Sequence, residues 1–285
     1  MLLAVRNAQD IITPHIRDSH VIDYPCLKPG FMCDLELPRW APLHLGPITL
    51  DMSPTKHVVW LGIAAICCLI ALLSAARAHQ RAAVSGNAPK GFANGIEALV
   101  LYLRNEVVLP NVGAHGDKYV PFILTLFFFI LFANLGGLIP YGSTATGNIS
   151  VTATLAIVTF IMVEVAGMRA QGMGYLGTIF YWPHNMSLAL KLPMTVLMTP
   201  LEIIGKFTKP FALAIRLFAN MTAGHVVLLA LIGLIFTFGS YFIIPAPLAM
   251  ATAISVLELF VAFLQAFIFA LLASVFIGQI RTAAH

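Results

Sequence analysis

The feature that most constrains this chain is a series of apolar runs that are each long enough to cross a lipid bilayer. They cover residues 58–76, 119–139, 149–168, 188–238 and 248–280. A spanning helix needs about 20 apolar residues, whereas a strand of a membrane barrel needs only about ten residues of alternating pattern. Because a backbone in lipid must satisfy its hydrogen bonds within the protein, these continuous runs predict helices.

The composition favours lipid rather than water as the surrounding solvent. Of the 285 residues, 59% are hydrophobic and 10% are charged, against roughly 45–50% and 25% in an average soluble domain. The net charge of +4 is small and the basic residues are scattered, so we expect no nucleic-acid partner. The chain is therefore predicted to be an all-α integral membrane protein with about five membrane-embedded segments.

The last two apolar runs are too long to stand upright in a membrane. At about 1.5 Å per residue, residues 188–238 would form about 75 Å of helix, whereas the hydrocarbon core is about 30 Å thick. Pro193, Pro200 and Pro210 are candidate bends in this run. We expect residues 188–238 and 248–280 to form two long, strongly tilted helices.

Polar segments set the domain organisation. Residues 1–55 read as a polar tail, and 56–280 as a single helical membrane domain. Between the first two spans, residues 93–109 place apolar side chains at helical spacing but are too polar to span. They predict one interfacial amphipathic helix.

The basic residues of the loops predict the orientation in the membrane. The 77–118 loop carries five Lys or Arg, and Arg169 and Arg281 follow later spans, whereas the 141–148 and 239–247 connectors carry none. By the positive-inside rule, the two uncharged connectors face outside. The N-terminal tail then lies outside and the C-terminus lies in the cytoplasm.

Ionisable side chains are concentrated in the last two runs, although each one near a helix centre costs about 2.5–3.5 kcal/mol. They are Glu202, Lys206, Lys209, Arg216, His225 and Glu258. Glu202 and Lys206 are four residues apart and share a helix face, so they suit a charge pair, with lysines reaching the interface as the alternative. Glu202 also suits an aqueous exit path.

Arg216 stands apart from the other charges because no acidic residue lies within four positions of it. Its guanidinium keeps its proton at any accessible pH, and Asn220, one turn further on, can hydrogen-bond but cannot neutralise it. A carboxylate from elsewhere is therefore expected. Either another subunit supplies it, or Arg216 forms a buried ion pair with Glu258.

Glu258 and Gln265 are seven residues apart and lie on nearly one face of the last helix. If the last two helices pack antiparallel, His225 and Glu258 fall toward the outer end of the pair. A histidine beside a carboxylate titrates within reach of neutral pH and suits a proton relay. The alternative for His225 is a hydrogen-bonded core histidine.

Four segments resemble the a subunit of rotary ATP synthases, the membrane stator beside the c-ring. The most specific is KPFALAIRLFANMTAGH, from Lys209 to His225, and the similarity covers about residues 50–280. The others are FANLGGLIP at 132–140, TGNISVT at 146–152 and LELFVAFLQAFIF at 257–269.

The resemblance implies roles for the matching positions. Arg216 would face the ionised carboxylate of the c-ring and keep two aqueous half-channels apart. The proton route beside it would be lined by Asn220, His225, Glu258, Gln265 and, on the exit side, Glu202. Asn134 would lie beside the outer half-channel.

The resemblance also implies partners, location and differences. The partners would be the c-ring, the peripheral-stalk b subunits, the lipid bilayer and protons, with no catalytic site in this chain. The membrane would be a bacterial inner membrane, with an organellar one as the alternative. Some members exchange the positions of the acid and the histidine, and many carry an acid where Gly136 and Gly137 stand here.

Two other function classes are open at this stage, a stand-alone proton-coupled transporter and a metal-dependent membrane enzyme. The lack of internal repeats and the unpaired Arg216 favour a stator. No HExxH or CxxC pattern occurs, so we expect no metal and no cofactor. Cys26 and Cys33 could form a disulfide or stay as two thiols.

Overall fold

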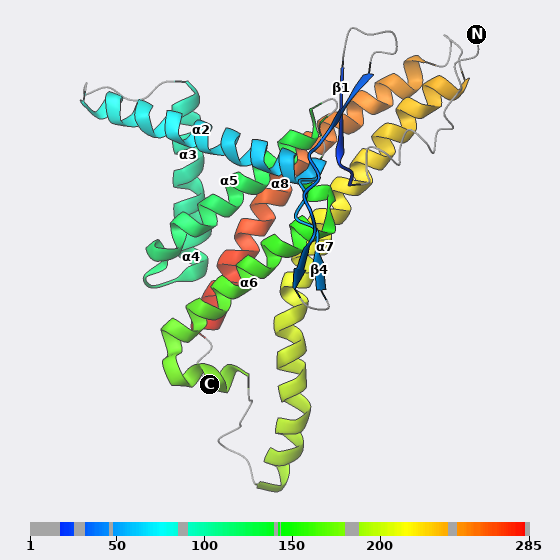
Figure 1. Cartoon of the computed structure of the whole chain (residues 1–285). Helices are drawn as coiled ribbons and strands as arrows, with labels where there is room; N and C mark the ends of the chain where they lie inside the picture. Colours follow the sequence, from blue (N-terminus) through cyan, green and yellow to red (C-terminus); the bar gives the residue numbers. More distant parts are fainter. Residues whose placement is uncertain are drawn as a thin grey trace. The chain divides into compact units, whose positions relative to one another are not determined.

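The computed structural model describes residues 18–25, 32–45, 48–84, 91–139, 142, 144–179, 188–238 and 244–282. Five of its helices are long and apolar enough to cross a membrane, which confirms the predicted helical membrane fold (Figure 1). These helices are α2 (Lys56–Val84), α5 (Val120–Gly137), α6 (Ile149–Gln171), α7 (Leu188–Phe238) and α8 (Pro245–Thr282).

The last two helices have the predicted length. Helix α7 has 51 residues and α8 has 38, which correspond to about 76 Å and about 57 Å of helix. Helix α7 contains Pro193, Pro200 and Pro210, yet it continues through all of them. The strong tilt of both helices in a bilayer stays a prediction.

The chain forms two compact units, and α2, α5, α7 and α8 contribute to both. The first unit comprises Met1–Ile70, Phe129–Asn148 and Leu217–Gln265. The second unit comprises Ala71–Phe128, Ile149–Arg216 and Ala266–His285. The division of the chain into a 1–55 tail and a 56–280 membrane domain stays a prediction.

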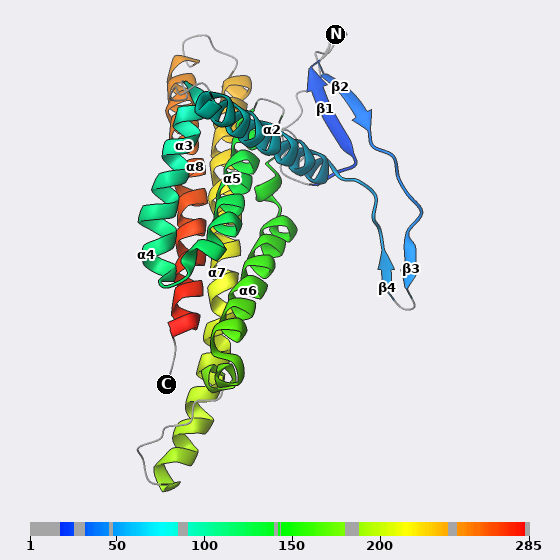
Figure 2. The same cartoon turned by 90° about the vertical axis from the view of Figure 1, so that its left-hand side faces the viewer.

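In the first unit, the N-terminal tail contains four short strands, which the sequence did not predict. Antiparallel pairs form between β1 (Val21–Pro25) and β2 (Met32–Glu36), and between β3 (Leu43–Leu45) and β4 (Ile48–Leu50) (Figure 2). An isolated two-stranded ribbon is marginally stable. Backbone bonds from Leu37 to His20 and from Lys56 to Ser19 tie the tail to itself and to the start of α2.

In the second unit, the predicted 93–109 helix is present and is longer than expected. It consists of α3 (Phe92–Tyr102), a π-helical turn, η1 (Leu103–Val108), and α4 (Leu109–Val112). Its buried face packs along α8, where Gly278 has no room for a side chain against the carbonyl of Asn111. A location at the membrane surface stays a prediction for this segment.

Short 3₁₀ turns complete the described helices. They are η2 (Gly116–Tyr119), η3 (Ala145–Gly147) and η4 (Gly172–Thr178). Turn η3 belongs to the first unit and η4 to the second. Each carries polar side chains to one of the two sites described next, so the connections matter as much as the helices.

Candidate functional site

A cluster of polar side chains surrounds His225 in the first unit, and we call it the His225 cluster. The imidazole of His225 on α7 lies with Nδ1 3.4 Å from Oε1 of Glu258 on α8. Glu258 is 8% exposed. Gly224 makes this approach sterically possible, because a side chain at that position would overlap the Glu258 carboxylate. The predicted pairing of His225 and Glu258 is therefore confirmed.

The other ring nitrogen fixes which proton the histidine carries. Nε2 of His225 lies 2.9 Å from the carbonyl oxygen of Gly137 and 2.7 Å from Oγ1 of Thr144. A carbonyl can only accept, so Nε2 carries the hydrogen. In the neutral ring Nδ1 is then an open acceptor facing Glu258, and it makes no aligned hydrogen bond with the described residues. The pair can therefore take up and release one proton.

Gly137 explains why no acid stands after Asn134 in this chain. A side chain at Gly137 would overlap the hydroxyl of Thr144. The backbone of α5 thus approaches the connector closely, and its carbonyl contacts His225. Replacing the glycine with an aspartate or glutamate would separate both contacts.

Asn134 holds three elements of the first unit together. Its side chain is 0% exposed. Its Oδ1 accepts a bond from the Thr146 hydroxyl at 2.7 Å, and its Nδ2 donates to the carbonyl of Ala262 at 3.1 Å. Both ends of the amide are occupied, so the visible role of Asn134 is to join α5, the connector and α8. Its place beside a proton route stays a prediction.

Asn220 and Gln265 form a second polar contact between α7 and α8 in the first unit. Nδ2 of Asn220 donates to Oε1 of Gln265 at 3.0 Å. Gln265 is 1% exposed, and its Nε2 has no hydrogen-bond partner among the described residues. A buried amide with a free donor is costly unless water or a ligand satisfies it. This pair therefore suits the lining of a hydrated path.

Arg216 is exposed on α7 in the second unit, and it forms no hydrogen bond or ion pair within the part of the chain that the structure describes. Its exposed neighbours are apolar, and they include Phe211 and Ile215. Ala212, one turn earlier, is small and exposed. A permanent cation on an apolar membrane face needs a counter-ion. Since Glu258 is engaged by His225, that counter-ion is not explained by this chain.

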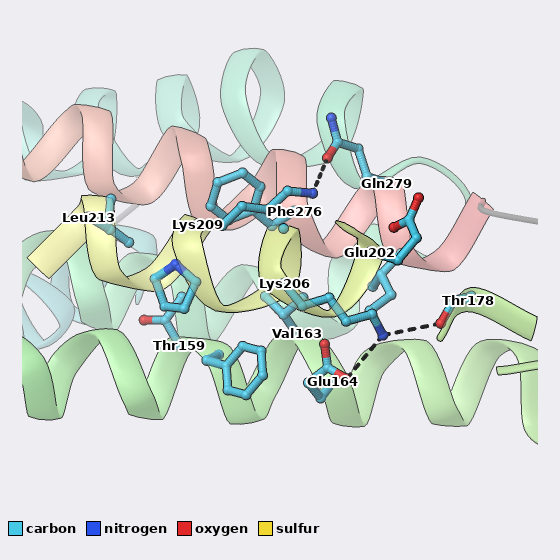
Figure 3. Close-up of a pocket in the computed structure, with 14 residues that line it drawn as sticks. Thr159, Val163, Glu164, Thr178, Glu202, Lys206, Lys209, Leu213, Phe276 and Gln279 are labelled. Carbon is cyan, nitrogen blue, oxygen red and sulfur yellow. Dashed lines mark hydrogen bonds and ion pairs between the residues drawn. The ribbon is translucent and has the colours of Figure 1, made fainter. Parts of the chain in front are cut away.

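A second polar site, which we call the Lys206 cavity, lies in the second unit between α6, α7 and α8. It has a volume of about 170 Å³. Figure 3 shows that the ammonium group of Lys206 points toward Glu164 and Thr178, whereas Lys209 points toward Gln279. The lining residues that carry charge are Glu164, Glu202, Lys206 and Lys209.

The Lys206 ammonium is fully occupied within this cavity. Nζ lies 3.4 Å from Oε2 of Glu164, 3.1 Å from the Tyr175 hydroxyl and 3.2 Å from Oγ1 of Thr178. An ammonium has three donors, and three acceptors surround it here. The side chains of Lys206 and Glu164 are each mostly buried. The pair is therefore a fixed structural contact.

The expected pair of Glu202 with Lys206 is not formed. Glu202 is exposed, and no described residue hydrogen-bonds or pairs with its carboxylate, which points away from the Lys206 ammonium (Figure 3). Lys206 instead chooses Glu164, because the partly buried acceptors of α6 and η4 compete better than an exposed carboxylate one turn away. Glu202 is thus left open to exchange protons with water in the cavity.

Sequence reasoning missed the residues that surround the charged groups. It did not assign roles to Thr144, Glu164, Tyr175, Thr178 or Gln279, all of which contact a predicted site residue or a lysine of the cavity. Thr144 lies in a short connector without periodicity. Glu164 was visible as an acid inside an apolar run, but its partner lies on another helix.

Metal chemistry finds no support in the described part of the chain. No group of three or more His, Cys, Asp or Glu side chains among the described residues is placed to hold a metal ion. The pairing of Cys26 with Cys33 concerns side chains outside the described ones. The arrangement suits transfer of protons between a histidine, carboxylates and water.

Comparison with known proteins gives a consistent result. The family described as ATP synthase A chain matches residues 58–278. ATP synthase subunit a of Chloroherpeton thalassium is 48% identical over 264 residues, which cover 91% of this chain and 74% of that protein. ATP synthase subunit a of Anaeromyxobacter dehalogenans is 43% identical over 272 residues, which cover 94% of this chain and 69% of that protein.

A third relative covers slightly more of both chains. ATP synthase subunit a 2 of Prosthecochloris aestuarii is 43% identical over 279 residues, which cover 95% of this chain and 79% of that protein. The similarity thus includes both the helical membrane part and much of the N-terminal tail.

Proposed function

Because the chain belongs to the ATP synthase A chain family, we propose that its two polar sites serve the two half-channels of a rotary proton motor. The chain is the proton-conducting stator subunit of the Fo membrane sector, and catalysis of ATP formation lies in the F1 subunits. The observation that carries the proposal is the unpaired Arg216 on an apolar face of α7. Polar sites lie in both units, one on each side of Arg216 along the α7 sequence.

The His225 cluster serves proton entry from the outside. Its support is chemical, since Nδ1 of His225 is an open acceptor beside the Glu258 carboxylate. A proton bound by this pair can move on along α7 and α8 through water beside Asn220 and Gln265. The free donor of Gln265 gives such water a bonding partner.

The Lys206 cavity serves proton exit to the cytoplasm. Its exchanging group is Glu202, which lines the cavity and has no partner among the described residues. Lys206 and Glu164 hold one wall in place, and Lys209 adds a second positive charge through its contact with Gln279 at 3.2 Å. Two cations in the wall disfavour entry of protons from this cavity without a driving force.

Arg216 prevents protons from passing directly between the two routes. A guanidinium attracts an ionised carboxylate of the ring and repels a migrating proton. The ring carboxylate becomes protonated at the outer route, turns through the lipid, and releases its proton at the exit route. Each charge that crosses a potential of 100 mV releases about 2.3 kcal/mol, and this energy drives rotation.

The partners and the location follow from this mechanism. The counter-ion of Arg216 is a carboxylate of the c-ring, and peripheral-stalk b subunits hold the stator against rotation. The chain is a multi-pass membrane protein, and we place it in a bacterial inner membrane. The tail and the 141–148 connector face outside, whereas the C-terminus faces the cytoplasm, as the distribution of basic residues predicts.

Substitution of Arg216 tests this proposal. In Arg216→Ala, ATP-driven proton pumping by inverted vesicles should fall by about 100-fold, because a fixed electrostatic partner is lost. The complex should still assemble. Arg169→Ala, which removes an exposed arginine at the end of α6, is the matched control and should pump normally. Coupled pumping at the wild-type rate in Arg216→Ala would refute the assignment.

A further inference from the structure

The connector between α5 and α6 carries three polar side chains to three different partners of the first unit. Thr144 contacts Nε2 of His225, Thr146 donates to Asn134, and Asn148 donates from Nδ2 to Oδ2 of Asp18 at 3.1 Å. These three residues are separated by only one residue each. Movement at one end of the connector therefore reaches the other end.

Asp18 belongs to the N-terminal tail and bridges the connector to the start of α2. Its Oδ1 lies 2.6 Å from Nδ1 of His57, a ring that is 3% exposed. The backbone holds the same place, because the amide of Lys56 donates to the carbonyl of Ser19 at 2.9 Å. Asp18 is thus fixed on one side by α2 and binds the connector on the other.

The carboxyl of Asp18 is ionised under ordinary conditions. Burial would raise its pKa, but the hydrogen bond and the charge of the His57 ring outweigh burial and hold the pKa below the ordinary value of 3.8. An ionised carboxylate only accepts hydrogen bonds, and such bonds are stronger than those between neutral groups. Both of its oxygens are used, one by His57 and one by Asn148.

We propose that Asp18 is a positioning residue for the proton-exchanging histidine, acting through Asn148 and the connector to hold Thr144 against Nε2 of His225. This inference rests on the proposed role of the His225 cluster in proton entry. It gives the N-terminal tail a function in the motor, namely to clamp the connector from outside the membrane-spanning helices.

The physical consequence of releasing the clamp lies at His225. The hydroxyl of Thr144 is one of two groups that hold Nε2, and the other is the Gly137 carbonyl. If Asn148 loses Asp18, the connector can shift and withdraw Thr144. The ring then turns more freely, and Nδ1 spends less time facing Glu258, so proton exchange slows.

Two single variants and their combination test this chain of contacts in the assembled complex. Asp18→Ala and Thr144→Ala should each slow ATP-driven proton pumping by about threefold to tenfold, as expected for lost hydrogen bonds to a charged or functional group. Because both act through one contact, the double variant should pump like Thr144→Ala alone. Effects that multiply would show an independent structural role for Asp18 and overturn the proposal.

Asp51→Ala is the matched control within the same tail. Asp51 hydrogen-bonds to Ser53 and forms no described contact with the connector. This variant should pump at the wild-type rate per assembled complex. A loss equal to that of Asp18→Ala would mean that any disturbance of the tail is harmful, which would also overturn the proposal.

An exchange of the two partners provides a rescue. In Asp18→Asn with Asn148→Asp, the amide at position 18 can donate to the new carboxylate and still accept from His57. Pumping should return to within about twofold of wild type, whereas each single substitution stays slow. Failure of the rescue in a folded, assembled complex would contradict the clamp. Arg216→Ala is measured beside it, so the proposed function can hold while this inference fails.

Discussion

The His225 cluster and the Lys206 cavity both place a carboxylate oxygen 3.4 Å from a basic nitrogen, yet the two pairs differ in what they can do. In the cluster the base is a histidine, whose ordinary pKa is about 6.5, and in the cavity it is a lysine, whose ordinary pKa is about 10.4. One base changes its charge near neutral pH and the other keeps it. The same distance therefore supports proton exchange in one unit and a fixed charge in the other.

Hydrogen bonding sharpens this difference. The ammonium of Lys206 has three acceptors for its three hydrogens, two of them hydroxyls. Nδ1 of His225 has no aligned partner among the described residues. A satisfied ion pair stabilises a wall, whereas an open acceptor beside a carboxylate is prepared to bind a proton. The function of a buried acid thus depends on its partner and on the bonds that the partner has left.

The comparison would be broken most clearly by substitution of its acids. Glu258→Gln should slow proton flux through the assembled complex by about 100-fold, because the group that shares the proton with His225 is lost. Glu202→Gln should slow it less, since an exposed carboxylate in a hydrated cavity can be bypassed by water. Passive proton uptake by vesicles lacking F1 measures both. The reverse order of effects would mean that the entry path is assigned to the wrong unit.

The space at Gly137 offers a sharper test with a neighbouring control. In Gly137→Ala, the new methyl group overlaps the Thr144 hydroxyl, so Thr144 and the Gly137 carbonyl separate near Nε2 of His225. We expect proton flux to fall by about tenfold, because overpacking forces local shifts that cost about 1–3 kcal/mol. Gly136→Ala meets no atom within 4 Å and should leave the flux unchanged. Equal effects of the two substitutions would remove the support for a Thr144 contact.

The smallest effect on flux is expected in the Lys206 cavity. Lys206→Met leaves the Glu164 carboxylate without its cation, and we expect a loss of about 2 kcal/mol in stability, since breaking a mostly buried pair is costly. Proton flux should change by less than about threefold, because a fixed pair transfers no proton. Thermal denaturation of the purified complex measures the first quantity. Glu164→Leu added to Lys206→Met should recover most of the lost stability, and a flux loss as large as that of Glu258→Gln would contradict the comparison.

The sequence predicts the helices and their charged groups well, and predicts the contacts between helices poorly. Spacing along one helix placed Glu258 and Gln265 on one face, and antiparallel packing was enough to bring Glu258 toward His225. The same reasoning gave the wrong partner for Lys206, because a same-helix pair at four residues is visible in sequence and a partner such as Glu164 on α6 is not.

The connector and the tail lie beyond what periodicity can predict. Thr144 lies in a short turn, where no repeating pattern shows which side chain faces a helix. The strands of the tail are three to five residues long, too short to show an alternating pattern. Asp18 contacts Asn148 across 130 positions, a separation at which sequence spacing carries no information.

The central claim is that Arg216 finds its counter-ion on the c-ring, and a cross-link beside it tests this claim directly. In a chain whose four native cysteines are replaced, a cysteine at the exposed Ile215 is paired with a cysteine next to the ring carboxylate. Oxidation should join the two subunits, whereas a cysteine at the buried Ala214 should not react. No product at position 215, in a complex that still assembles, would contradict the account.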